Sequence, residues 1–208
     1  MIIVSSFKLE YNEQTGFFSI LADEECGCPL CSGELAYRNS RERKSISNIG
    51  EISLFLLRRL RCLLCKKLHT EIPDTIQPYR HYDSAAIQSV LEGAEDATMC
   101  VADDSTMRRW KASFAEAEPH IGQRLDSIQA HMTDGMLPLA SSGQALKRIK
   151  ASHKRWLAFV MGLLINMGHG PCTRFAFCPP ASADRICKTG KIAGTGGGRI
   201  DKTFDDTG

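Results

Sequence analysis

The chain carries nine cysteines, and four of them stand in two matching pairs with two residues inside each pair. Cys28 and Cys31 form the first pair, and Cys62 and Cys65 form the second. A C-x-x-C turn points two thiolates at one tetrahedral centre, and two such turns supply the four ligands of a closed structural zinc site. A β-hairpin would fill the 30 residues between the pairs. The sequence therefore predicts a zinc ribbon that holds a structural Zn²⁺ through these four cysteines.

Other arrangements of the thiols compete with this site. A redox-active pair would lie in a βαβ setting near a helix N-terminus, which neither pair shows, and the plain alternative is two unrelated pairs of free thiols. Cys26 and His69 are close enough in sequence to replace a ligand, but we expect both to be bystanders. Four further residues are irregularly spaced and predict no second zinc site: His169, Cys172, Cys178 and Cys187.

The composition is typical of a globular chain in a reducing compartment. The 208 residues include 26 Lys and Arg against 24 Asp and Glu, with 43% hydrophobic residues. These values exclude a disordered chain, a collagen-like repeat and a membrane bundle. Residues 1–10 show no secretory signal, so we expect a cytoplasmic protein with reduced thiols. The most apolar stretch, Trp156 to Met167, is shorter than the roughly 20 residues of a membrane helix, which favours a buried helix and no membrane partner.

Positive charge gathers between and just after the cysteine pairs. Residues 35–70 contain nine basic residues and two acidic ones, and residues 52–61 alternate between apolar and polar side chains as a strand does. A basic ribbon of this kind binds nucleic-acid phosphates and gains affinity from released counterions. The residues that we expect to contact DNA in this region are Arg58, Arg59, Arg61, Lys66 and Lys67.

A second signal for DNA binding begins at Asp103. Asp and Ser side chains favour helix starts, so a helix should begin at Asp103 to Ser105, directly after a short helix over residues 96–102. Met107, Trp110 and Phe114 recur at helical spacing and form one apolar stripe. A short helix, a tight turn and an anchored second helix are typical of a helix-turn-helix.

The opposite face of this second helix offers hydrogen-bond donors. Arg108 and Arg109 could bind guanine through two hydrogen bonds each, and Ser105 or Lys111 could hold phosphates. The alternative is an ordinary amphipathic surface helix with solvated arginines. The short preceding helix and the basic ribbon upstream favour double-stranded DNA as the partner.

Together these signals predict an α+β fold, in which a small zinc ribbon (a β-hairpin with zinc knuckles) precedes a mainly α-helical helix-turn-helix region. Helices are expected over residues 83–92, 96–102, 105–131 and 142–168. The predicted divisions are an N-terminal segment (1–25), the zinc ribbon (26–78), the helix-turn-helix domain (79–134), a basic C-terminal helical segment (135–187) and a disordered glycine-rich tail (188–208).

Several short motifs carry a family resemblance. They are the Cys28-Pro29-x-Cys31 opening, Leu60-Arg61-Cys62-x-x-Cys65, Ile72-Pro73, Pro78-Tyr79, Asp103-Asp104-Ser105-Thr106-x-Arg108-Arg109-Trp110 and Cys172-Thr173-Arg174-x-Ala176-Phe177. Over roughly residues 25–178 the chain resembles an uncharacterised bacterial family of zinc-ribbon and helix-turn-helix proteins, similar to the DNA-binding front ends of insertion-sequence transposases. The resemblance implies the same four zinc cysteines, a recognition helix at Ser105 to Phe114 and, by analogy, a mobile-element context.

No catalytic site is indicated. A nuclease or transposase active site needs several carboxylates around metal ions, and residues 135–183 contain no Asp or Glu. The sequence favours a sequence-specific DNA-binding protein that serves a mobile element or transcription, with a transposase or another mobile-element protein as a further partner and no small-molecule substrate. The alternatives are a protein-interaction adaptor, which would use the ribbon and the apolar helix at Trp156 to Met167, and an RNA-binding protein that uses the basic ribbon.

Overall fold

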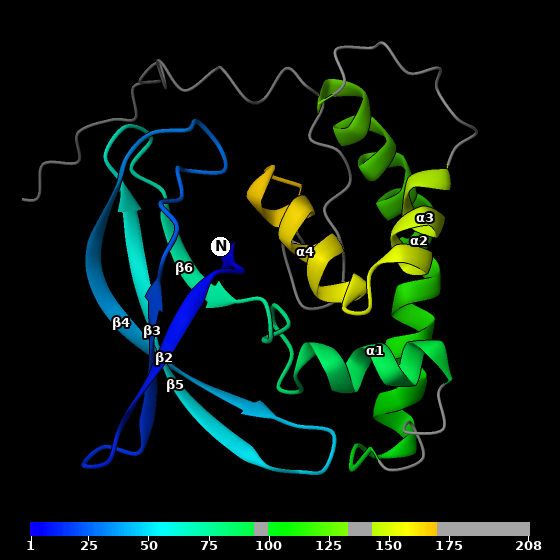
Figure 1. Cartoon of the computed structure of the whole chain (residues 1–208), viewed down its shortest axis with the longest axis horizontal. Coiled ribbons are helices and arrows are strands. Elements are labelled where there is room, and N and C mark those ends of the chain that lie inside the picture. The colour runs from blue at the N-terminus through cyan, green and yellow to red at the C-terminus, as the bar shows by residue number, and fades with distance from the viewer. Residues whose placement is uncertain (94–99, 133–142, 170–208) are drawn as a thin grey trace, which may run out of the picture.

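The structure is a computed structural model and describes residues 1–93, 100–132 and 143–169. Six strands precede four helices along the chain, and Figure 1 shows the curled sheet lying beside the group of helices. The strands are β1 (Ile2–Val4), β2 (Phe7–Asn12), β3 (Phe17–Ala22), β4 (Leu35–Ile46), β5 (Ile52–Cys62) and β6 (Leu68–Pro73). The helices are α1 (Ser84–Glu92), α2 (Asp104–Met132), α3 (Gln144–Ser152) and α4 (Trp156–Asn166).

Strand β5 is the centre of the sheet. One edge of β5 pairs with β4 as an antiparallel hairpin, from Ile46 opposite Ile52 to Leu35 opposite Cys62. The other edge is shared, because β3 runs parallel to the first half of β5 and β6 runs antiparallel to the second half. Strand β1 adds to β6 in parallel, and β2 adds to β3 as a second hairpin. The sheet is therefore mixed, with the order β1-β6-β5-β3-β2 and β4 on the far side of β5.

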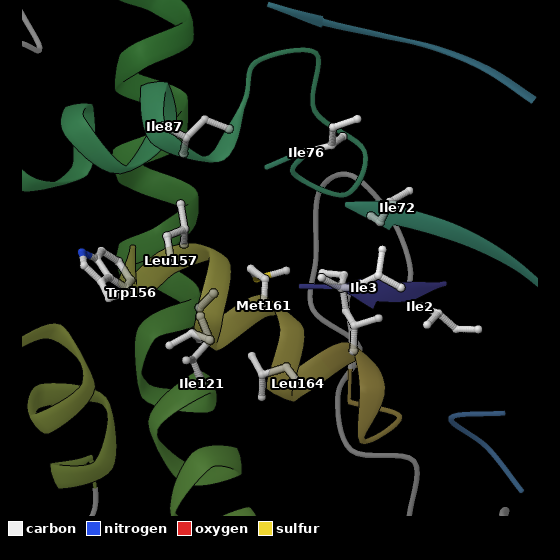
Figure 2. Close-up of a cluster of buried hydrophobic side chains, with 14 of the residues drawn as sticks. Ile2, Ile3, Ile72, Ile76, Ile87, Ile121, Trp156, Leu157, Met161 and Leu164 are labelled. Carbon is white, nitrogen blue, oxygen red and sulfur yellow. The ribbon is translucent and has the colours of Figure 1, made fainter. Parts of the chain in front are cut away.

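Helix α4 joins the sheet to the other helices. Its sequence is apolar almost throughout, and most of its side chains are buried. Figure 2 shows α4 side chains between Ile121 of α2 and Ile3 of β1. At the end of α4, the Asn166 side chain accepts a hydrogen bond from the Ile3 backbone N–H (2.9 Å) and donates one to the Ile3 carbonyl (2.8 Å). Asn166 thus satisfies backbone groups of β1 that face away from β6.

The predicted fold class is wrong in both of its parts. The cysteine-bounded hairpin exists as β4 and β5, but these strands belong to a six-stranded mixed sheet and do not form a separate zinc ribbon. The sheet recruits residues 1–25, for which the sequence indicated only a terminal segment, through the parallel pairs β1–β6 and β3–β5. These pairings join strands far apart in the chain, and no short sequence pattern predicts them.

The helix-turn-helix is also not seen. Residues Cys100 to Asp103 are not helical, and the rest of the predicted short helix, up to residue 99, lies outside the described residues. The expected recognition helix is the first third of the 29-residue helix α2, which continues through Pro119. The apolar stripe of α2 is buried for the length of the helix and packs into the core: Trp110, Ala117, Ile121, Leu125 and Ile128.

Other local predictions are confirmed. Strand β5 and helix α1 follow the predicted bounds closely, and the stretch at Trp156 is a buried helix. The predicted helix over 142–168 is divided into α3 and α4 near His153. Within the described part of the chain, no helix has both the length and the apolar composition needed to cross a bilayer. The predicted tail at 188–208 lies outside the described residues, as do Cys172, Cys178 and Cys187.

Candidate metal centre

The two cysteine pairs meet at the base of the β4–β5 hairpin. The first pair precedes β4 and the second begins at the last residue of β5, where Leu35 and Cys62 are direct partners. A backbone hydrogen bond from Leu63 N to Glu34 O (2.9 Å) ties the two segments together just beyond the sheet. The hairpin therefore brings sequence positions 28 and 65 to one point.

Each pair is built as the same tight turn. In the first, the Ser32 N–H donates to Cys28 O (2.8 Å), and in the second the Lys66 N–H donates to Cys62 O (3.1 Å). The residue after each second cysteine has a left-handed backbone, with φ of 55° at Ser32 and 62° at Lys66. Since non-glycine residues rarely adopt this conformation, its repetition indicates that both knuckles have the same geometry. No residue type at these positions predicted it.

The four sulfur atoms form a compact cluster. All four Sγ atoms lie within 4.8 Å of one another. The Cys31–Cys62 distance is 3.5 Å and the Cys28–Cys65 distance is 3.7 Å. Four thiolates at about 2.3 Å from a tetrahedral ion are about 3.8 Å apart, so the cluster has the dimensions of a four-sulfur metal site. The four cysteines can thus hold a metal ion, as the spacing predicted.

The packing around the sulfur atoms leaves no room for a larger residue at Gly33. A Cβ at this position would lie 2.8 Å from Leu64 Cβ and 3.0 Å from Cys62 Sγ. The residues just after α4 pack against the first knuckle, where a Cβ on Gly168 would lie 2.8 Å from Pro29 O. Close packing therefore surrounds both knuckles, while Cys31 and Cys65 remain partly exposed.

The thiols differ in acidity. Burial raises the pKa of Cys28 to about 12. Desolvation also opposes the ionisation of Cys62, but the backbone N–H groups of Cys65 and Leu64 outweigh it and lower the pKa of Cys62 to about 6. Cys62 is therefore a more acidic thiol than Cys28, and the thiolate is the form that binds a metal.

His69 and Cys26 lie beside the cluster and outside it. His69 is buried, and its Nε2 is 3.3 Å from Cys28 Sγ. Burial is the main cause that lowers the pKa of His69, so the neutral ring can donate a hydrogen bond to the Cys28 sulfur. Cys26 is half-buried and does not join the four sulfur atoms. Neither residue is one of the four clustered ligands, and His69 is placed to support the cluster through its contact with a ligand sulfur.

The basic residues predicted to bind DNA separate into different environments. Arg58 is an ion-pair partner of the buried Glu71, with Nε and Nη2 at 2.6 and 2.9 Å from its two carboxylate oxygens. Arg61 and Lys67 are exposed and Arg59 is half-buried. Lys66 shapes the second knuckle, and its Nζ donates to Leu63 O (2.5 Å).

The predicted contacts on α2 lie in its first two turns. Ser105 Oγ donates to the Asp103 carboxylate (2.5 Å), and Arg108 Nε donates to Asp104 O (3.2 Å). Arg109 is exposed and donates to Thr106 Oγ1 (2.8 Å). Lys111 is exposed on the side of α2 that faces Trp156 across a groove.

The two groups of predicted contacts lie toward opposite ends of the hairpin. The Val101 N–H donates to Asn48 O (3.1 Å), so the turn between β4 and β5 touches the segment that leads into α2. The metal centre lies at the opposite end of the same hairpin. The structure thus connects the cysteine cluster with the start of α2 through one pair of strands.

Comparison with known proteins finds a family match for part of the chain. Residues 28–110 match a domain of unknown function (DUF6431), a segment that begins at the first cysteine of the cluster and ends at Trp110. No curated protein and no solved structure matches the chain. The match fits the resemblance to an uncharacterised family, whereas the likeness to insertion-sequence transposases finds no support in these comparisons.

Proposed function

We propose that this is a DNA-binding protein in which the four clustered cysteines hold a structural Zn²⁺. Four thiolates in a closed tetrahedral arrangement favour zinc among the common metal ions. Its role would be to fix the base of the β4–β5 hairpin, since all four ligands come from the protein and no coordination position is left for a substrate. The observation that carries the proposal of DNA binding is the charge of one face of this hairpin.

The strand register assigns the arginines to that face. Arg43 lies opposite Phe55 and Arg41 opposite Leu57, so both arginines share a face with these two apolar residues. Arg59 lies on the same face, two residues beyond Leu57. Arg61 follows two residues later, and none of the residues on this face of β4, β5 and β6 is acidic, because Glu42 and Glu71 point to the other side.

Phe55 and Leu57 are buried in the core, so the accessible part of this face is where Arg41 and Arg61 are exposed and Arg59 is half-buried, and this part suits a DNA duplex. Each phosphate contact by an arginine releases counterions, and such contacts provide most of the affinity for DNA of any sequence. Arginine can also read guanine through base edges in the major groove. In this proposal the hairpin contacts DNA where the sequence had suggested a recognition helix. The apolar stripe of α2 is buried and packs into the core.

A salt series on the zinc-loaded protein tests the proposal. Binding to a fluorescent 20-base-pair duplex of random sequence should weaken log-linearly with salt concentration. Arg59→Ala and Arg61→Ala should each reduce the slope by about 0.9, whereas Arg148→Ala, which removes an exposed arginine from α3, should leave it unchanged. Selection from a random duplex pool should then enrich one sequence, and that sequence distinguishes a mobile-element end from a promoter.

Two results would contradict the proposal. Binding to single-stranded or hairpin RNA with no measurable affinity for duplex DNA would assign the basic face to RNA. Absence of binding to both nucleic acids at low salt would favour a protein adaptor. The apolar helix α4 is buried in the core and cannot serve as the adaptor's docking surface. The adaptor would instead use the other face of the hairpin, where the exposed fractions of Ile52, Leu54 and Leu56 are 58%, 37% and 37%.

A further inference from the structure

The loop at residues 77–81 is held against β4 by a buried guanidinium. Arg43 Nη2 donates to Gln77 O (3.1 Å) and also to Arg80 O. Within the loop, the Arg80 N–H donates to Gln77 O (3.2 Å), and Tyr79 has a left-handed backbone with φ of 59°. The loop is therefore a fixed turn that places Arg80 beside the basic face of the hairpin.

The same loop is fixed against α2 on its other side. Tyr82 and Trp110 pack edge to face with ring centroids 5.0 Å apart. Arg80 precedes Tyr82 by two residues, and Arg109 is the neighbour of Trp110 in the chain, so this contact brings the two arginines into one region. Burial and the positive charge of Arg109 both lower the pKa of Arg80, in agreement with that proximity.

The hairpin contributes the remaining positive charge. Arg41 lies two residues before Arg43 on the same strand face and is exposed. The positive charge of Arg41, after the larger effect of burial, lowers the pKa of Arg43. Three separate segments of the chain thus place Arg41, Arg43, Arg80 and Arg109 around one junction.

These arginines are not neutralised by ion pairs with carboxylates. Among the described residues, the ion pairs involve other basic side chains, namely Arg58, Lys150 and Arg155. Asp103, just before α2, accepts hydrogen bonds from Thr106 Oγ1 (2.9 Å) and the Thr106 N–H (2.8 Å). Like charges near one another without a carboxylate partner repel each other, and a bound anion would remove that cost.

We propose that Arg41, Arg80 and Arg109 bind the phosphodiester backbone of duplex DNA, and that Arg43 is the residue that positions them. This inference rests on the proposed function and gives it a second contact region, beyond Arg59 and Arg61. Phosphate is favoured because three segments bring arginines to one junction, and arginine binds phosphate oxygens through two parallel N–H groups. The site would hold the backbone at the hairpin tip and so orient the basic face along the duplex.

The test uses the full zinc-loaded chain and the same 20-base-pair duplex. Each of three variants should lower the slope of log affinity against log salt by about 0.9: Arg41→Ala, Arg80→Ala and Arg109→Ala. Each should also weaken binding about 8-fold at 0.1 M salt, because the affinity from one phosphate contact varies as the salt concentration to the power of about −0.9. The triple variant should lose about 500-fold by the same relation. Arg148→Ala on α3 is the matched control, and melting temperature and zinc content must equal those of the wild type.

The outcomes separate this inference from the proposed function. If Arg59→Ala and Arg61→Ala weaken binding while the three variants behave as Arg148→Ala does, the arginine cluster is refuted and DNA binding by the hairpin stands. If the wild type binds no duplex, both fail. If it binds inorganic pyrophosphate instead, with loss in Arg80→Ala, the cluster takes small phosphate anions and the assignment to DNA is overturned.

Discussion

Replacement of Cys62 by serine should remove the metal and loosen the hairpin. The Cys62 side chain is fully buried, its sulfur is 3.5 Å from that of Cys31, and it accepts a hydrogen bond from the Cys65 N–H (3.4 Å). A serine hydroxyl stays protonated at neutral pH, so it cannot take the place of a thiolate ligand. Three cysteines would remain, and we expect the zinc affinity to fall at least about 100-fold.

The size of the effect on stability follows from the loop that the metal closes. With a bound ion, Cys31 and Cys62 are cross-linked across the 30 residues between them. Treated as a cross-link of the unfolded chain, a loop of this length stabilises the fold by about 4 kcal/mol. For a chain of this size, that loss lowers the melting temperature by about 8 to 16 °C.

The assay compares metal content and melting with a matched cysteine variant. Cys26→Ser is the control, because Cys26 lies two residues from Cys28 and outside the sulfur cluster. Wild type and control should bind one zinc per chain, show the intense charge-transfer absorption of a four-sulfur site when loaded with Co²⁺, and lose stability in a chelator. Cys62→Ser should melt near the chelator-treated wild type and respond little to chelator. A Cys62→Ser protein with one equivalent of zinc and the wild-type melting temperature would refute the metal assignment.

Three further predictions concern α2 and the sheet. Trp110→Ala removes the buried ring that packs on Tyr82 and should cost about 3 to 5 kcal/mol in urea unfolding; a loss below about 1 kcal/mol would place Trp110 outside the core. Hydrogen bonds from Ser105 and Thr106 hold the pKa of Asp103 well below its usual range. Asp103→Ala should therefore have a lower melting temperature than wild type at pH 7. The difference in melting temperature should narrow as the pH falls below about 4, because the stability that comes from a depressed pKa is lost when the carboxylate is protonated. A difference that does not change with pH would contradict this. Arg58→Ala leaves the carboxylate of Glu71 buried without its partner and should lower the free energy of unfolding by about 3 kcal/mol. Glu71→Gln should cost less, because Arg58 is partly exposed and can reach water. Equal losses of stability in chemical denaturation would be inconsistent with this difference.

The local elements could be predicted from the sequence, and the way they pair could not. The cysteine spacing predicts the metal cluster because both knuckles are short and local, and the alternation of residues 52–61 predicts β5 for the same reason. The parallel pairing of β1 with β6 joins Ile2 to Glu71, and no short pattern in either segment reports such a contact. The aspartates near residue 103 did mark the start of a helix, but the same capping chemistry begins a recognition helix and a core helix alike.

The metal centre and the basic face are linked through strand register. In a β-strand, a shift of one residue would turn every side chain to the opposite face, so that Arg41 and Arg43 would point away from Arg59. The hairpin register is fixed at one end by the pairing of Leu35 with Cys62, which the cysteine cluster adjoins, and along the strand by the burial of Phe55 and Leu57. A long edge strand rich in arginine has few apolar anchors of its own. A metal ion at the base of the hairpin therefore favours the one register that keeps the arginines together, although no cysteine lies on the face that we propose for DNA.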